Sequence, residues 1–283
     1  MDERTLSIDG VRVPRFLYGT AWKEDQTQRL STLALEQGFR GIDTANQRKH
    51  YFEAAVGLAV KAALANNLVK RDEVFLQTKF TFVDGQDHRL PYDPAAPIGK
   101  QVEQSFASSL EHLGASIIDS YLLHGPTQRS GLAVADWEAW RAMEALHDGS
   151  RARLLGVSNF TLEQLQRLCE QARVPPRFVQ NRCYASRGWD RAIREFCGAR
   201  GMVYQGFSLL TVNRDLLAHP EMVRIARRHG RSVAQVVFRF ALDAGMVPLT
   251  GTADAGHMRE DLEVFAFRLE PEDAERIERL AAT

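Results

Sequence analysis

Short apolar runs alternate with longer amphipathic stretches along almost the whole chain. We interpret the apolar runs as strands, at residues 15–19, 40–43, 74–79, 117–124, 154–159, 178–181, 202–207 and 246–251. Stretches with helical spacing of apolar residues separate them, at residues 27–37, 52–65, 98–113, 137–147, 162–172, 190–200, 222–229, 233–244 and 257–265. This alternation predicts β–α units built around a parallel sheet.

The number of β–α units indicates the architecture. Eight units in a chain of 283 residues match a TIM (β/α)8 barrel. No linker or low-complexity segment interrupts the series, so we expect a single domain spanning residues 1–283. A doubly wound open sheet is the alternative, but it would call for a G-x-G-x-x-G motif, which the sequence lacks. Asp9-Gly10, between two short alternating runs, predicts an N-terminal β-hairpin before the barrel.

Polar residues stand at the ends of five consecutive predicted strands. A TIM barrel places its active site at the C-terminal ends of its strands, where such side chains can meet. Each residue alone has an ordinary explanation, such as capping of the next turn. Five of them at equivalent positions indicate one shared site. They are Asp43, Lys79, His124, the pair Ser158–Asn159, and Gln180.

These residue types suggest proton-transfer chemistry. A buried lysine is costly unless a carboxylate pairs with it, so we expect Lys79 to pair with Asp43. A tyrosine beside this lysine, Tyr51, would have its pKa lowered from about 10 and could exchange a proton near neutral pH. His124 could hold the oxygen of a substrate by a hydrogen bond. Together they predict a site for a carbonyl compound or an alcohol.

Composition and charge narrow the function classes. Lys and Arg (36) balance Asp and Glu (36), so the basic excess of a nucleic-acid-binding protein is missing. No apolar run approaches the roughly 18–20 residues of a membrane helix, and the charged N-terminus lacks the apolar core of a secretory signal. The three cysteines, Cys169, Cys183 and Cys197, lack metal-ligand spacing and predict reduced thiols and no metal site. We therefore expect a cytoplasmic protein, as a monomer or a weak homo-oligomer.

Several motifs, in order and at matching spacing, carry a family resemblance. They are "YGTAW", "GFRGIDTA", "LQTKF", "DSYLLHGP", "GVSNF", "FVQNRCY" and "MREDLEVF", which together cover nearly the whole chain. In these motifs the sequence resembles the aldo-keto reductases. The resemblance implies a TIM barrel that binds NADPH in an extended pose without a Rossmann fold. It also implies reduction of a small aldehyde or ketone by hydride transfer.

The resemblance assigns roles to individual residues. Asp43 and Lys79 correspond to the residues that tune the catalytic tyrosine, and His124 to the residue that orients the carbonyl. Phe207 stands where the family usually stacks a tyrosine on the nicotinamide, and its ring keeps the face needed for stacking. The complete set of implied cofactor contacts is Gly19, Thr20, Ala21, Asp43, Ser158, Asn159, Gln180, Phe207, Ser208, Leu209, Leu210, Thr250, Gly251, Thr252, His257, Arg259, Glu260 and Asp261.

The catalytic tyrosine is the first departure from the family pattern. The family usually reads D-T-A-x-x-Y-x-N-E, but here Arg48 occupies the tyrosine register and the loop is about three residues longer. Counting back from Glu53 places His50 at the tyrosine's position, with Tyr51 one residue later. We predict that Tyr51 is the proton donor, and His50 is the alternative.

The second departure concerns the ribose 2′-phosphate of the cofactor. Many family members clamp it with a lysine and an arginine after the eighth strand, and here these positions are Gly251 and His257. Thr250, Thr252, Arg259 and backbone N–H groups at a helix start remain as partners. We therefore expect weak discrimination, with NADPH as the cofactor and NADH possible.

The substrate pocket is the third departure. The chain ends soon after a predicted helix at residues 271–282, without the long C-terminal loop of many members, so we expect an open pocket. The long loop at residues 80–97 and the loop after Phe207 would supply its walls. The predicted substrate contacts are Trp22, Tyr51, Phe80, Phe82, Tyr92 and His124.

The sequence thus predicts an NAD(P)H-dependent carbonyl reductase with Tyr51 as general acid. One rival is a regulatory or scaffold barrel that binds nicotinamide with little or no turnover. Another is a phosphate-handling TIM-barrel isomerase or aldolase, in which Lys79 would form a Schiff base.

Overall fold

A computed structural model describes residues 3–280 and shows a closed barrel of eight strands. The strand order is β10-β3-β4-β5-β6-β7-β8-β9, and every neighbouring pair is parallel. The strands are β3 (Leu17–Gly19), β4 (Gly41–Asp43), β5 (Phe75–Phe80), β6 (Ile118–Leu123), β7 (Ala152–Ser158), β8 (Phe178–Arg182), β9 (Val203–Phe207) and β10 (Val247–Thr250). The predicted (β/α)8 barrel is confirmed.

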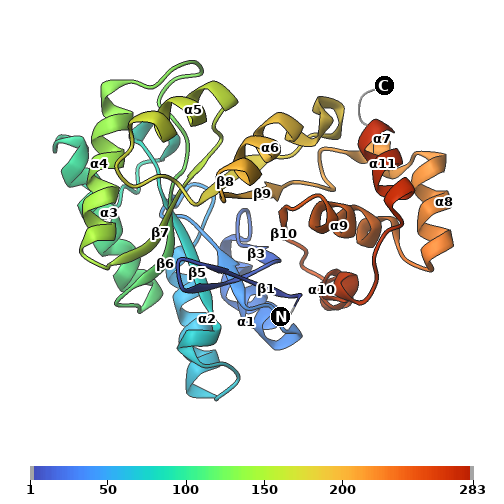
Figure 1. Ribbon diagram of the computed structural model, residues 1–283. Coiled ribbons are helices and arrows are strands. Elements are labelled where there is room, and N and C mark those ends of the chain that lie inside the picture. The colour runs from blue at the N-terminus through green and yellow to red at the C-terminus, as the bar shows by residue number, and fades with distance from the viewer. Residues whose placement is uncertain (1–2, 281–283) are drawn as a thin grey trace.

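Helices surround the barrel (Figure 1). They are α1 (Thr27–Gln37), α2 (Glu53–Ala65), α3 (Ile98–Leu113), α4 (Val134–Asp148), α5 (Leu162–Gln171), α6 (Arg191–Ala199), α7 (Arg214–Leu217), α8 (Pro220–His229), α9 (Val233–Asp243), α10 (Ala255–Leu262) and α11 (Pro271–Leu280). Helices α1 and α3 begin and end at the predicted residues. Each is terminated by a glycine in the left-handed conformation, Gly38 (φ 108°) and Gly114 (φ 60°).

Most other helices differ from the predicted ranges by one to three residues at an end, as in α10, which covers Ala255–Leu262 rather than residues 257–265. Helices α4 and α7 show why. Helix α4 begins at Val134 rather than Trp137, because the carboxylate of Asp136 accepts a hydrogen bond from the backbone N–H of Ala133 at 2.7 Å and stabilises an earlier start. Helix α7 was not predicted, because a single turn carries too little periodicity to be recognised.

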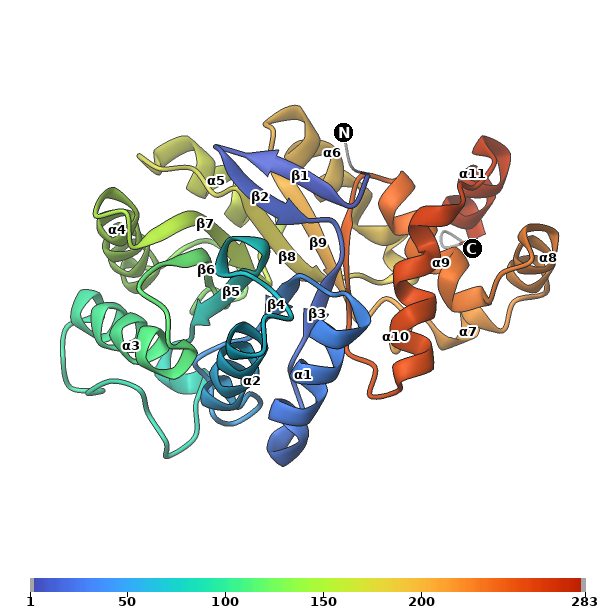
Figure 2. The ribbon, with the colours of Figure 1, turned by 90° about the horizontal axis from the view of Figure 1, so that it is seen from below.

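The predicted hairpin is confirmed and closes one end of the barrel. Strands β1 (Thr5–Ile8) and β2 (Val11–Pro14) pair antiparallel around Asp9 and Gly10, both at positive φ. Val13 of the hairpin packs in one apolar cluster with Phe75 and Phe178, the first residues of β5 and β8. The hairpin therefore covers the N-terminal ends of the strands (Figure 2), and the C-terminal ends remain for a functional site.

The larger apolar cluster lies between the strands and the surrounding helices and includes the fully buried Trp140 and Trp189. All three cysteines are free thiols, with Cys183 and Cys197 buried and Cys169 half-buried. None of the helices within residues 3–280 combines the length and the apolar character that a membrane crossing requires.

We predict that Gly57→Ala destabilises the fold. Gly57 lies where α2 contacts α3, and a Cβ atom there would meet the carbonyl oxygen of His112 at 1.9 Å and the Cα of Leu113 at 2.9 Å. The backbone of α3 would have to move, so we expect the free energy of unfolding, measured in urea, to fall by about 3 kcal/mol. Gly198→Ala in α6 is the matched control. A Cβ there meets nothing within 4 Å, so stability should stay equal or rise by up to about 1 kcal/mol. Equal effects of the two substitutions would contradict this view of the α2–α3 contact.

Candidate active site

A buried ion pair lies at the C-terminal ends of β4 and β5. Asp43 is 3% exposed and Lys79 is fully buried. The ammonium of Lys79 donates to both carboxylate oxygens of Asp43, at 2.8 and 2.7 Å, and to the carbonyl oxygen of Thr44 at 2.7 Å. Burial lowers the pKa of Lys79, and the charge of Asp43 opposes that shift. The predicted pairing of the two residues is therefore present in the structure.

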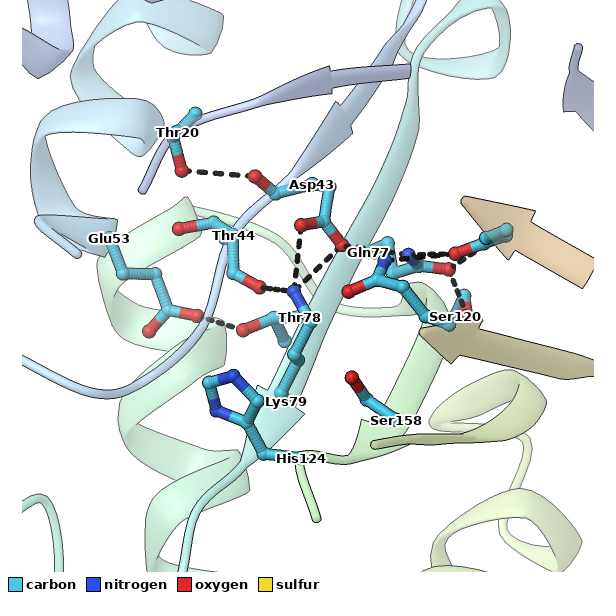
Figure 3. Close-up of polar contacts among 12 residues, drawn as sticks. Thr20, Asp43, Thr44, Glu53, Gln77, Thr78, Lys79, Ser120, His124 and Ser158 are labelled. Atoms are coloured by element: carbon cyan, nitrogen blue, oxygen red, sulfur yellow. Dashed lines mark hydrogen bonds and ion pairs between the residues drawn. The ribbon is translucent and has the colours of Figure 1, made fainter. Parts of the chain in front are cut away.

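Three glutamine side chains extend this pair across the barrel interior. Figure 3 shows Gln77 beside Asp43 and Lys79. Gln77 and Gln180 each donate through Nε2 to Oδ1 of Asp43, at 2.7 and 2.9 Å, and both also donate to Oε1 of Gln205. Gln205 returns a hydrogen bond to Oε1 of Gln77. Because a carboxylate only accepts, Asp43 fixes which end of each amide faces it. Both N–H groups of Gln180 are thus used inside the barrel, and its Oε1 is left to accept from a ligand.

Tyr51 lies beside the ion pair but is not activated by it in this structure. Its ring centroid is 5.3 Å from Nζ of Lys79. Burial raises the pKa of Tyr51, and the negative charge of Asp43 raises it further. The prediction that Lys79 lowers this pKa is therefore wrong here, because Lys79 directs its hydrogens at Asp43 and Thr44. The phenol stays protonated at neutral pH, which is the state that a proton donor requires.

The structure separates the two candidate proton donors. A cavity opens at the C-terminal ends of the strands, and Tyr51 lines it. His50 does not line this cavity, and its ring packs on that of Trp22 with centroids 3.9 Å apart. The backbone carbonyl of His50 accepts from the N–H of Trp22 at 2.7 Å, which fixes the loop against the segment after β3. The longer loop thus presents Tyr51, rather than His50, to the cavity.

His124 follows β6 and also lines the cavity, with its ring centroid 5.8 Å from that of Tyr51. Burial holds the pKa of His124 well below its usual value, and the charge of Lys79 adds to the effect. Its backbone carbonyl accepts from Nδ2 of Asn159 at 2.8 Å. Asn159 adopts a left-handed conformation (φ 59°), which asparagine tolerates better than most residues.

The cavity at this end of the barrel has a volume of about 460 Å³, within the usual range of ligand sites. Most of the residues predicted to contact a cofactor line it. They are Gly19, Ala21, Asp43, Ser158, Asn159, Gln180, Phe207, Ser208, Leu209, Leu210, Thr250, Gly251 and Thr252.

Five predicted cofactor contacts lie outside this lining. Thr20 is fully buried, and its hydroxyl donates to the backbone carbonyl of Asp43 at 3.0 Å, so its role in the structure is to support that strand end. The others are on α10, beyond the cavity: His257, Arg259, Glu260 and Asp261. Arg259 instead donates to the side chain of Gln37 at 3.2 Å.

Three of the four aromatic residues predicted to form the substrate wall do not line the cavity. Phe80 and Tyr92 are buried and pack on each other with centroids 5.7 Å apart, and Phe82 packs edge-on against Phe80. These contacts link the end of β5 to the loop that follows it. Trp22 does line the cavity and is 68% exposed.

The sequence interpretation missed several residues of the site. Lys23 lines the cavity, and its ammonium donates to the carbonyl oxygen of Gly251. Thr211, Phe238 and Leu249 also contribute to the lining. Within residues 3–280, no group of three or more His, Cys, Asp or Glu side chains is arranged to hold a metal ion.

Comparisons of the sequence and the structure with known proteins lead to one family. Residues 16–282 match the sequence profile of the Aldo/keto reductase family. A glyoxal reductase of Bacillus subtilis (strain 168) is 30% identical, over 96% of this chain and 90% of that protein. The crystal structure of an aldo/keto reductase from Brucella melitensis has a TM-score of 0.82 at 27% identity and covers 98% of both chains. An aldo-keto reductase of Bombyx mori, solved with NADP, has a TM-score of 0.83 at 24% identity, covering 97% of this chain and 92% of that one.

Proposed function

The chain belongs to the aldo/keto reductase family, and on this premise we propose that it is an NADPH-dependent reductase of small aldehydes or ketones. The observation that carries the proposal is that Tyr51, His124 and Asp43 line one cavity, with Lys79 paired to Asp43 behind it. The chemistry of these side chains suits proton transfer to a carbonyl oxygen, which is one half of a carbonyl reduction.

The cavity lining fits a nicotinamide dinucleotide. Phe207 offers an aromatic face, and Oε1 of Gln180 is available to accept from an amide N–H. Lys23 places a cation beside Gly251, where a phosphate can bind. These features support placing the nicotinamide near Gln180 and a phosphate near Lys23.

The bound reduced cofactor supplies the hydride for the carbonyl carbon. In the proposed reaction, His124 holds the carbonyl oxygen, and the hydroxyl of Tyr51 gives it a proton. The ammonium of Lys79, on β5, then stabilises the phenolate left on Tyr51. Asp43 keeps Lys79 protonated in a buried position, where an unpaired ammonium would lose its proton.

We predict that Tyr51→Phe removes the proton donor while leaving the ring in place. The kcat for aldehyde reduction should fall by about 10²–10⁴, with NADPH affinity nearly unchanged. His50→Ala is the matched control and should retain most of the activity, because His50 does not line the cavity. NADPH oxidation with several aldehydes measures kcat, and tryptophan fluorescence measures binding. An active Tyr51→Phe enzyme with an inactive His50→Ala enzyme would reverse the assignment. Wild-type activity in both would reject the proposed acid.

We also predict that Lys23 restores a preference for NADPH over NADH. A Cβ atom on Gly251 would lie 3.4 Å from Nζ of Lys23, so this ammonium occupies the space of a side chain at position 251. A charge-assisted hydrogen bond to the extra phosphate contributes about 1.5–3 kcal/mol. Lys23→Met should therefore reduce the preference, as a ratio of Kd values, by about tenfold or more.

Arg259→Ala serves as the control for Lys23→Met. Arg259 does not line the cavity, so its loss should leave the cofactor preference almost unchanged. If Lys23→Met weakens NADPH and NADH binding equally, Lys23 does not contact the distinguishing phosphate.

A further inference from the structure

The imidazole of His124 makes a polar contact with a residue outside the cavity lining. Nδ1 of His124 lies 2.7 Å from the hydroxyl oxygen of Thr81, at hydrogen-bond distance. Thr81 is 6% exposed and follows the end of β5. Thr81 belongs to the loop at residues 81–97, in which the ring of Tyr92 packs on Phe80 and does not line the cavity.

The loop fixes Thr81 through its carbonyl oxygen and its methyl group. Its carbonyl oxygen accepts from the hydroxyl of Tyr92 at 2.8 Å and from Nε2 of Gln86 at 3.4 Å. Its methyl group packs against Gly85, where an added Cβ would lie only 2.6 Å from it. A β-branched side chain has few rotamers, and this packing selects one of them. The hydroxyl is thereby aimed at His124.

The chemistry of a neutral imidazole makes this contact consequential. Burial and the nearby charge of Lys79 keep the pKa of His124 well below its usual value, so the ring is neutral at pH 7. A neutral imidazole carries one N–H, on either Nδ1 or Nε2, and the hydrogen bond at one nitrogen selects the state of the other. To hold a carbonyl oxygen, the nitrogen that faces the substrate must carry the hydrogen. With Nδ1 directed at Thr81, that nitrogen is Nε2.

We propose that Thr81 is a positioning residue that donates its hydroxyl hydrogen to Nδ1 of His124 and so holds the ring in the tautomer with the hydrogen on Nε2. The proposal rests on the proposed function, in which His124 binds the carbonyl oxygen. The proposal gives the loop after β5 a defined role. Tyr92, Gln86 and Gly85 hold Thr81 in place, and Thr81 then selects the nitrogen of His124 that carries the hydrogen. In the opposite arrangement Nδ1 would donate to Thr81, and Nε2 could only accept.

Thr81→Val tests the proposal, because valine has nearly the same shape and lacks the hydroxyl. Thr81→Ser is the matched control, because it keeps the donor. Long-range proton–nitrogen NMR of ¹⁵N-histidine-labelled, cofactor-free protein reports which nitrogen of His124 carries the hydrogen. We expect the Nε2–H signature in the wild type and in Thr81→Ser, and a mixture of tautomers in Thr81→Val. The kcat/KM for aldehydes should fall by about 10-fold to 100-fold in Thr81→Val and recover in Thr81→Ser, with unchanged NADPH affinity.

Two results would overturn the proposal. One is an Nδ1–H signature of His124 in the wild type. The other is a Thr81→Val spectrum identical to that of the wild type. The NMR measurement needs no turnover, so it is separate from the test of the proposed function. A wild type that fails to reduce aldehydes rejects the function, whereas a tautomer that ignores Thr81 rejects only the positioning role.

Discussion

The buried charge of Asp43 is the constraint on which the site depends. A carboxylate that is 3% exposed is stable only when hydrogen-bond donors surround it. Asp43 accepts hydrogen bonds from Lys79, Gln77 and Gln180. Because Asp43 can only accept, it orients the two amides, and Gln205 completes the network between them. One ionised group on β4 thereby fixes the orientation of the hydrogen-bonding side chains on β5, β8 and β9.

The same constraint explains the state of Tyr51. Lys79 is fully engaged with Asp43 and Thr44, so its charge is largely neutralised and the phenol remains protonated. A protonated phenol suits the proposed role of Tyr51 as the proton donor in a carbonyl reduction. In the proposed reaction, Lys79 acts after the proton transfer, because its ammonium lies 5.3 Å from the ring centroid of Tyr51. The ion pair therefore leaves the phenol protonated and holds the ammonium of Lys79 beside its ring.

The sequence predicted the barrel and the strand-end residues well, because both follow from local pattern. Asp43, Lys79 and His124 could be found because parallel strands bring their C-terminal ends together. Phe80 was misplaced, although it directly follows Lys79 and neighbouring residues of a strand point to opposite faces. The same rule could have revealed Gln77, two residues before Lys79 and on its face. Lys23 and Thr81 could not be assigned from pattern, because their contacts with Gly251 and His124 depend on how loops from distant parts of the chain fold together.

The most direct test of this account is a double-mutant cycle on the ion pair, measured as the free energy of unfolding in urea. Asp43→Asn and Lys79→Met each leave a buried charge without its partner, so each should cost about 3–5 kcal/mol. The double variant leaves no unpaired charge, and its cost should be smaller than the sum of the two by about 2 kcal/mol or more. Costs that add within about 0.5 kcal/mol would show that the two residues act independently, and would contradict the view that this pair organises the site.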